Sequence, residues 1–464
     1  MTPPSENADT TAIRNPPRFA EALRVWAQIA ALSFGGPTGQ IAVMHRLLVD
    51  RHRWISDRRF LHALNYCMLL PGPEAHQLVT YTGWLLHGVR GGLSAGLLFV
   101  LPGAVALGVL SVLYVEYQQT PLLQGVFYGL KAAVLAVVIE AVIRIGRRVL
   151  RNPAMYALAA AAFLAIRFLG IPFPWIIGGA ALAGLVGGWI NERLFLVVAP
   201  RQSAADAARE AEYLISTHSP PSGRPPSLGS SLATTALWLA IWWLPVGLCW
   251  LVWGPDSILV AEGLFFSQAA LLTFGGAYAV LPYVAQQVVE THQWLTTGEM
   301  MDGLGLAEST PGPLIIVLQF VGFLAAYRNP GALSPWTAAC LGSVITTWVT
   351  FAPSFLFIFV GAPWIERWRD SRQLSLALSG VTAAVVGVIL NLACWFAVQT
   401  LLRSEPTAWA GWPQIPLGTW GTLDLVALGL ALAAGVALLR FHLGLGWVLG
   451  AAAVGGWLAL QAAH

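Results

Sequence analysis

The sequence predicts an all-α polytopic membrane protein, with about 10–13 membrane segments in two homologous repeats of inverted topology and with helices broken by Gly and Pro. Three observations predict it. Of the 464 residues, 57% are hydrophobic and only 10% are charged, whereas a soluble chain carries roughly 25% charged residues. Charge-free apolar runs long enough to cross a bilayer recur along the chain. Finally, two stretches share motifs at a constant spacing.

The composition excludes a soluble enzyme, a disordered chain and a nucleic-acid-binding module. The 47 Gly, 29 Pro and 21 Trp fit membrane helices, where Gly and Pro are tolerated and Trp gathers at the interfaces. No Cys-x-x-Cys or His-Glu-x-x-His pattern occurs, and the single lysine, Lys131, does not follow a phosphate-binding glycine loop. We therefore expect no enzyme activity, no ATP hydrolysis, no metal and no cofactor.

Polarity divides the chain into four parts. Residues 1–18 are polar and are expected to form a cytoplasmic N-terminal tail, because they lack the apolar core of a cleaved signal peptide. Residues 19–191 form the first repeat, and 192–232 form a polar cytoplasmic linker rich in Arg, Ser and Pro. Residues 233–464 form the second, inverted repeat, which begins with an extra helix in the apolar segment 225–255.

The repeat is visible as motifs that recur 240 residues apart. Ser33-Phe34-Gly35-Gly36 returns as Thr273-Phe274-Gly275-Gly276, and Pro71-Gly72-Pro73 returns as Pro311-Gly312-Pro313. The gap-free offset gives identities at Phe34, Gly35, Gly36, Val49, His52, Trp54, Leu64, Pro71, Gly72, Pro73 and Leu78. Matches in the rarer Gly, Pro and Trp indicate an internal duplication.

Arginine placement predicts that the two repeats face opposite sides of the membrane, because short cytoplasmic loops collect Arg and Lys. Loop 45–59 carries five Arg, whereas its partner 285–299 has none. In the next pair of loops, 366–372 of the second repeat carries three Arg and 116–120 of the first carries none. In the third pair, 144–151 of the first repeat carries four Arg and 401–406 of the second carries one. We expect a multi-pass protein of the inner (plasma) membrane, with a cytoplasmic N-terminus, with 45–59 and 366–372 in the cytoplasm, and with 285–299 outside.

Inverted repeats with matched broken helices are typical of secondary transporters, whose site lies near the bilayer midplane. Gly36-Pro37, Gly72-Pro73 and Gly312-Pro313 fit helix starts inside the membrane, where backbone N–H groups and the helix dipole favour an oxyanion. The alternative is that these residues merely kink spanning helices. The candidate substrate-binding residues are Ser33, Gly35, Gly36, Thr38, Gln40, Gly72, Pro73, Glu74, Gln77, Thr273, Gly275, Gly276, Ser309, Thr310, Gly312 and Pro313.

Four acids stand in apolar context, and an intramembrane carboxylate is a functional hypothesis by default. They are Glu74, Glu140, Glu262 and Glu308. Glu74 and Glu308 are candidates for proton coupling or gating, because each lies beside a Pro-Gly-Pro motif. Each could instead pair with an Arg or stabilise a half-helix N-terminus. Lys131 lies within a predicted span, where it supplies a positive field or extends to the interface.

Several motifs resemble the chromate ion transporter family, in its long two-domain form. In the first repeat they are Phe34-Gly35-Gly36-Pro37, Leu70-Pro71-Gly72-Pro73-Glu74-Ala75 and Arg90-Gly91-Gly92. In the second they are Thr273-Phe274-Gly275-Gly276-Ala277-Tyr278, Ser309-Thr310-Pro311-Gly312-Pro313 and Phe351-Ala352-Pro353-Ser354-Phe355. The resemblance implies chromate export, with sulfate as a competing or exchanged anion. Ala277 replaces Pro37 and Leu314 replaces Glu74, so the two repeats are not equivalent.

The leading hypothesis is a secondary transporter of tetrahedral oxyanions, with chromate efflux that confers chromate resistance, by exchange with sulfate or alone. An anion channel and a sulfate uptake carrier stay open as alternatives. A non-transporting membrane receptor or scaffold is the alternative of another class, which the lack of a sizeable polar domain disfavours. The expected partners are chromate or sulfate and the lipid bilayer, without nucleic acid, and a homodimer is left open.

Overall fold

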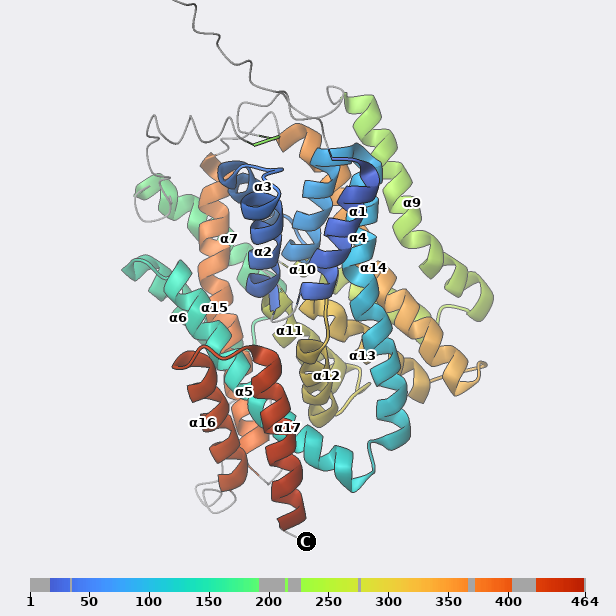
Figure 1. Cartoon of the computed structure of the whole chain (residues 1–464), viewed down its shortest axis with the longest axis vertical. Coiled ribbons are helices and arrows are strands. Elements are labelled where there is room, and N and C mark those ends of the chain that lie inside the picture. The colour runs from blue at the N-terminus through green and yellow to red at the C-terminus, as the bar shows by residue number, and fades with distance from the viewer. Residues whose placement is uncertain are drawn as a thin grey trace, which may run out of the picture.

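The computed structural model describes residues 17–33, 36–191, 213–215, 227–273, 277–365, 372–402 and 423–462. In these ranges the regular structure is helical, apart from isolated bridges at Ile55–Ile215 and Leu402–Leu423. The prediction of an all-α polytopic protein is therefore confirmed. Figure 1 shows the helices as an elongated bundle.

The described residues of the first repeat form eight helical elements. They are α1 (Phe19–Leu32), α2 (Gly36–His45), the π-helix η1 (Arg46–Arg51), α3 (Asp57–Leu69), α4 (Glu74–Tyr117), α5 (Pro121–Val149), α6 (Pro153–Phe168) and α7 (Phe173–Ile190). Polar side chains set several starts: Ser56 accepts from the Arg59 N–H, Thr120 from the Leu123 N–H and Asn152 from the Met155 N–H. Such N-caps satisfy N–H groups that lack an intrahelical partner.

The second repeat follows the same order after one extra helix, α9 (Leu228–Trp253), which begins inside the segment expected as linker. The elements are α10 (Ile258–Leu272), α11 (Ala277–Gln286), π-helix η3 (Gln287–Thr291), α12 (Thr297–Ser309), 3-10 helix η4 (Leu314–Ile316), α13 (Val317–Arg328), α14 (Pro335–Ile365), α15 (Arg372–Leu401), α16 (Leu425–Leu439) and α17 (Leu445–Ala462). The π-helix η1 of the first repeat has a counterpart in η3 of the second. The two repeats therefore share local backbone geometry as well as the order of their elements.

Seven of the described helices are long and apolar enough to cross a membrane, and four shorter apolar helices accompany them. Helix α4 is 44 residues long, which exceeds the roughly 20 residues of one crossing. Its backbone leaves helical geometry at His87 and Gly88, so it consists of two segments joined at a kink. The second repeat has a complete break there, between α13 and α14.

The predicted Gly/Pro breaks are present at both Pro-Gly-Pro motifs. Helix α3 ends at Leu69 and α4 begins at Glu74, with Pro73 at its N-cap; α12 ends at Ser309 and η4 begins at Leu314, with Pro313 at its N-cap. Proline fixes φ near the helical value and has no N–H to leave unpaired. The chain can therefore restart a helix directly after each motif.

The long helices of one repeat pack against the terminal helices of the other. Helix α5 packs on α16 and α17, and α15 packs on α6 and α7 (Figure 1). Glycines allow this contact: a Cβ at Gly129 would overlap the Ala452 carbonyl, and a Cβ at Gly380 would overlap the Ala180 carbonyl. Small residues let membrane helices approach closely, so the two repeats are interlocked.

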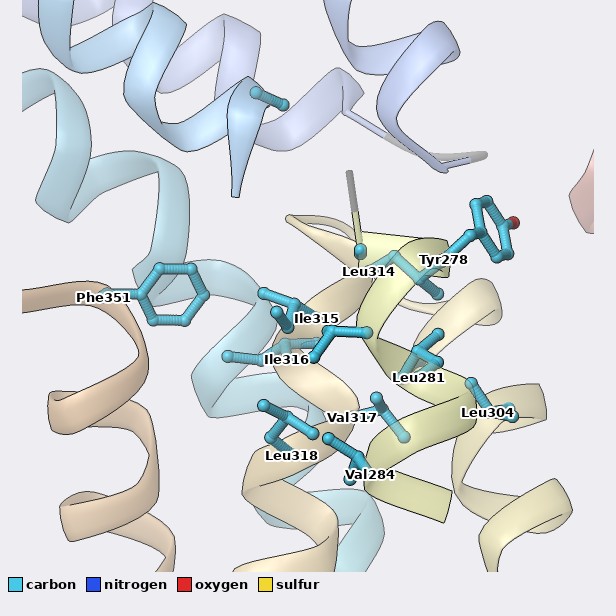
Figure 2. Packing of buried hydrophobic residues seen from close by; sticks show 14 of the residues in the cluster. Tyr278, Leu281, Val284, Leu304, Leu314, Ile315, Ile316, Val317, Leu318 and Phe351 are labelled. Carbon is cyan, nitrogen blue, oxygen red and sulfur yellow. The ribbon is translucent and has the colours of Figure 1, made fainter. Parts of the chain in front are cut away.

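The core continues between the broken helices of the second repeat. Figure 2 shows Leu281 and Val284 of α11 gathered with Ile315 and Val317 of η4 and α13, while Phe351 of α14 approaches from another side. All of these side chains are buried. The polar backbone groups at the ends of these short helices are thus enclosed by apolar side chains and kept away from lipid. The same packing holds the Pro-Gly-Pro turn of this repeat in place.

Candidate binding site between the two repeats

Two crossed hydrogen bonds join the motifs of the two repeats. The Gly72 N–H donates to the Thr273 carbonyl at 2.7 Å, and the Gly312 N–H donates to the Ser33 carbonyl at 2.8 Å. Ser33 and Thr273 are the residues that end α1 and α10. Each Pro-Gly-Pro turn is therefore held by the end of the first helix of the other repeat, at a place that we call the junction.

Gly72 and Gly312 are needed for backbone geometry at the junction. Their φ angles are +123° and +107°, which side chains other than glycine rarely adopt. Their own N–H groups are used in the crossed hydrogen bonds, so they are not free to bind an anion. The first turn of α4, directly after Pro73, does supply N–H groups without an intrahelical partner.

The turn of the first repeat lies between two polar side chains. A Cβ at Gly72 would lie 2.7 Å from Gln77 Nε2 and 3.0 Å from Ser354 Oγ. Gln77 Nε2 donates to the Pro71 carbonyl at 2.7 Å, which leaves its second N–H available. Ser354 Oγ is buried and has no hydrogen-bond partner among the described residues. Ser354 and Gln77 can therefore both donate to a ligand.

The turn of the second repeat is contacted by Gln40 from α2. Gln40 is 1% exposed, and its Nε2 donates to the Gly312 carbonyl at 2.6 Å. Its Oε1 is buried without a partner in the part of the chain that the structure describes. As for Gln77, one amide N–H stays available at the junction.

The predicted hydroxyl groups lie at the junction, but their protons point into their own helices. Ser33 donates to the Ile29 carbonyl at 2.5 Å, and Thr273 donates to the Ala269 carbonyl at 2.8 Å. Ser309 and Thr310 likewise donate to carbonyls one turn back, at 2.8 and 3.0 Å. In this structure these four hydroxyls therefore donate to carbonyls at helix ends.

A buried carboxylate lies where α2 meets α11 and α12. The Tyr278 hydroxyl donates to Glu308 Oε1, and a Cβ at Gly36 would lie 3.4 Å from that hydroxyl. Glu308 is 4% exposed, and its Oε2 has no partner among the residues with defined positions. Glu74, in contrast, is partly exposed and is the first residue of α4, where the helix dipole stabilises negative charge.

Gly35, Gly275 and Gly276 lie outside the described residues, and for Thr38 only its position in α2 is defined. Sequence reasoning did not include Ser354, Tyr278 or His76 in the site. His76 is fully buried, with its ring 5.0 Å from those of both Phe351 and Phe355. The signal that could have found them is their place within or beside the quoted motifs.

Comparison with known proteins gives the family. The chromate transporter profile matches residues 20–185 and 261–457. The chromate transport protein of Pseudomonas aeruginosa is 33% identical over 432 residues, which is 92% of this chain and 89% of the relative. The chain belongs to the chromate transporter family. As a member of it, with seven long apolar helices among the described residues, it is a multi-pass membrane protein.

Two further relatives are also similar to this chain. The chromate transport protein of Cupriavidus metallidurans is 26% identical over 406 residues, covering 86% of this chain and 89% of the relative. A probable chromate transport protein of Synechococcus elongatus is 27% identical over 378 residues, covering 81% and 83%. No solved structure matches the chain. The two matched ranges include Gly72 and Gly312, so each match contains one Pro-Gly-Pro turn of the junction.

The arginine-rich loop of the transporter borders a hollow at one end of the molecule. The hollow has a volume of about 540 Å³ and is lined by Pro17, Glu21, Arg51, His52, Arg53, Trp54 and Leu214. The Leu214 and Ile215 N–H groups donate to the Arg53 and Trp54 carbonyls. Burial and neighbouring Arg51 lower the pKa of His52, so the guanidinium groups supply the positive charge here. Two guanidinium groups and one carboxylate, that of Glu21, therefore line the hollow.

Proposed function

We propose that the chain is a secondary transporter that exports chromate across the inner membrane, with sulfate as a competing or exchanged anion. The observation that carries the proposal is the junction, where interrupted helices of two repeats meet through crossed hydrogen bonds. Ser354, Gln40 and Gln77 supply neutral donors around it, together with the first turn of α4. Donors of this kind bind a dianion without a permanent countercharge.

Shape alone favours neither substrate. Chromate and sulfate are both tetrahedral dianions, and hydrogen-bond donors from hydroxyl, amide and backbone groups recognise the oxygens that the two share. The names of the relatives in Pseudomonas, Cupriavidus and Synechococcus favour chromate. Chromate resistance would follow from its export.

Energetics favour export of a dianion from a negative interior. The voltage contributes about 2 × 2.3 kcal/mol per 100 mV for two charges. A proton entering against each exported dianion would make the cycle more electrogenic, whereas a sulfate entering would make it neutral. The charge moved per turnover therefore distinguishes uniport, proton exchange and sulfate exchange.

Flux of labelled chromate and sulfate into proteoliposomes, at controlled pH and voltage, tests this function. We expect flux that saturates with substrate and is accelerated by substrate on the opposite side, as in a carrier. Flux that is linear in concentration and insensitive to the opposite side would indicate an anion channel. Absence of chromate flux together with active sulfate entry would indicate a sulfate uptake carrier.

The role of Glu74 is tested by Glu74→Gln, because Gln keeps shape and hydrogen bonding without titrating. Its position at the start of α4 supports a structural role. We expect Glu74→Gln to lower transport alike at every pH, with Glu308→Gln compared in the same assay. A flat pH profile of Glu74→Gln, where the native profile is steep, would instead make Glu74 the proton carrier.

The membrane placement is part of the same proposal. Helix α4 exposes Leu97, Leu101, Val105 and Val109 at helical spacing, which makes an apolar stripe suited to lipid. With the arginine-rich loop in the cytoplasm, residues 1–18 and the linker 192–232 would be cytoplasmic and the α4–α5 turn external. The repeats 19–191 and 233–464 would then face opposite ways, as the crossed junction suggests.

A further inference from the structure

The single lysine of the chain forms an ion pair between the repeats, away from the junction. Lys131 of α5 lies with its Nζ 3.4 Å from Asp302 Oδ1 of α12. The lysine side chain is 30% exposed, whereas the aspartate side chain is 6% exposed. Only the cation of this pair is therefore accessible to a ligand that approaches from outside the protein.

The ammonium and the carboxylate of this pair lie in contact without a short hydrogen bond. A separation of 3.4 Å is longer than the 2.7–2.9 Å typical of charge-assisted hydrogen bonds. The other oxygen of Asp302 accepts from the Tyr114 hydroxyl at 2.9 Å. Tyr114 itself is fixed by edge contacts to Phe127 and Phe320. The carboxylate thus keeps a partner when the ammonium moves away.

The surroundings of Lys131 suit an anion. A Cβ at Gly298 would lie 3.2 Å from Nζ, so the missing side chain there lets the ammonium lie against the first turn of α12. Gly298 belongs to the first turn of α12, at the positive end of that helix. Helix α12 leads from this turn to Ser309, next to the Pro-Gly-Pro turn of the junction (Figure 1).

A neighbouring ion pair has the opposite character. Arg328 donates through two nitrogens to Glu299, and it also donates to the Trp294 carbonyl at 3.2 Å. Both partners belong to the second repeat, and Glu299 also takes part in the cap of α12. This bidentate pair is a structural contact, so it provides a matched control.

We propose that Lys131, near the N-terminus of α12, is a second contact for the tetrahedral dianion, which displaces Asp302 from the ammonium when it binds. This inference rests on the proposed function and names a further residue of the same route. A mobile ammonium with three donors can follow the oxygens of a passing dianion. The Tyr114 hydroxyl holds Asp302 meanwhile, which limits the cost of separating the pair.

The test compares Lys131→Met, Asp302→Asn and the control Arg328→Met in proteoliposomes with labelled chromate and sulfate. We expect Lys131→Met to raise KM about tenfold, because it removes one hydrogen bond between charged groups. Asp302→Asn releases the lysine and should lower KM by about threefold. Arg328→Met should leave KM unchanged, with any effect confined to thermal stability.

Two outcomes would contradict a role of Lys131 in binding the dianion. If Asp302→Asn raises KM as much as Lys131→Met, and the charge reversal Lys131→Asp with Asp302→Lys restores the native value, the pair is a structural link and the inference is wrong. An unchanged KM in Lys131→Met also overturns it. The native protein in the same vesicles tests the proposed function separately, because its failure to move either anion would not depend on any variant.

Discussion

At the scale of single residues, two glycines of the junction have both an unusual backbone conformation and a hydrogen bond to the other repeat. Gly72 and Gly312 adopt φ angles of +123° and +107°, and their N–H groups make the crossed hydrogen bonds. A side chain at either position would meet both backbone strain and neighbouring atoms: Gln77 Nε2 at 2.7 Å for Gly72, and Gly103 Cα at 3.3 Å for Gly312. The junction therefore depends on the absence of these side chains.

We expect Gly72→Leu and Gly312→Leu to abolish anion flux while membrane insertion stays intact. Leu is favourable in lipid, so a loss cannot come from reduced hydrophobicity, whereas a left-handed backbone costs about 1–2 kcal/mol for such a residue. Flux in proteoliposomes and protease protection in membranes measure the two properties. Native flux in both variants would move the binding site away from the junction.

At the scale of helices, the packing of the long helices of one repeat against the terminal helices of the other depends on small residues. Gly129 of α5 faces Ala452 and Gly456 of α17, and Gly380 of α15 faces Ala180 and Gly184 of α7. Helix association in lipid gains from such close backbone approach, because the hydrophobic effect does not drive it. The sequence pattern gives no sign of which helices these glycines contact.

Gly129→Ala should destabilise the protein by about 1–3 kcal/mol, because its Cβ overlaps backbone that cannot move without separating the helices. The matched control is Gly178→Ala in α7, where a Cβ meets nothing within 4 Å. Helix propensity favours Ala at both positions, so the difference reports packing. Melting temperatures in detergent measure it, and equal values for the two variants would contradict this account of the α5–α17 contact.

At the scale of the whole molecule, the two repeats share one element order but differ in charge. Arg53 and Gln293 occupy equivalent positions 240 residues apart, and both adopt a positive φ, of 51° and 52°. One belongs to the arginine-rich loop, and the other to a loop without arginine. The same backbone turn thus carries opposite signals for membrane orientation.

Single cysteines at Arg53 and Gln293, in a variant lacking the four native Cys, should react with an impermeant thiol reagent from opposite sides of the membrane. Both native side chains are exposed, so the reagent can reach the new thiols. Inside-out and right-side-out vesicles distinguish the two sides. Labelling of both positions from one side would end the proposal of inverted repeats.

Composition, apolar runs and the 240-residue offset are sufficient to predict an all-α membrane protein with a duplication and with helices restarted at Pro-Gly-Pro, because hydropathy and backbone restriction are local properties. The motif resemblance also predicted the family correctly. The count of segments was predictable only as a range, since α4 joins two segments through a kink at His87 and Gly88.

Only the tertiary structure decided which groups meet. The motif spacing identified Gly72 but could not pair its N–H group with the Thr273 carbonyl. It also gave no sign that the hydroxyls of Ser33, Thr273, Ser309 and Thr310 donate to carbonyls of their own helices. Ser354, Tyr278 and the Lys131–Asp302 pair come from helices far apart in the chain. Their proximity follows from helix packing across the repeats, which depends on complementary surfaces of both repeats together rather than on any local pattern.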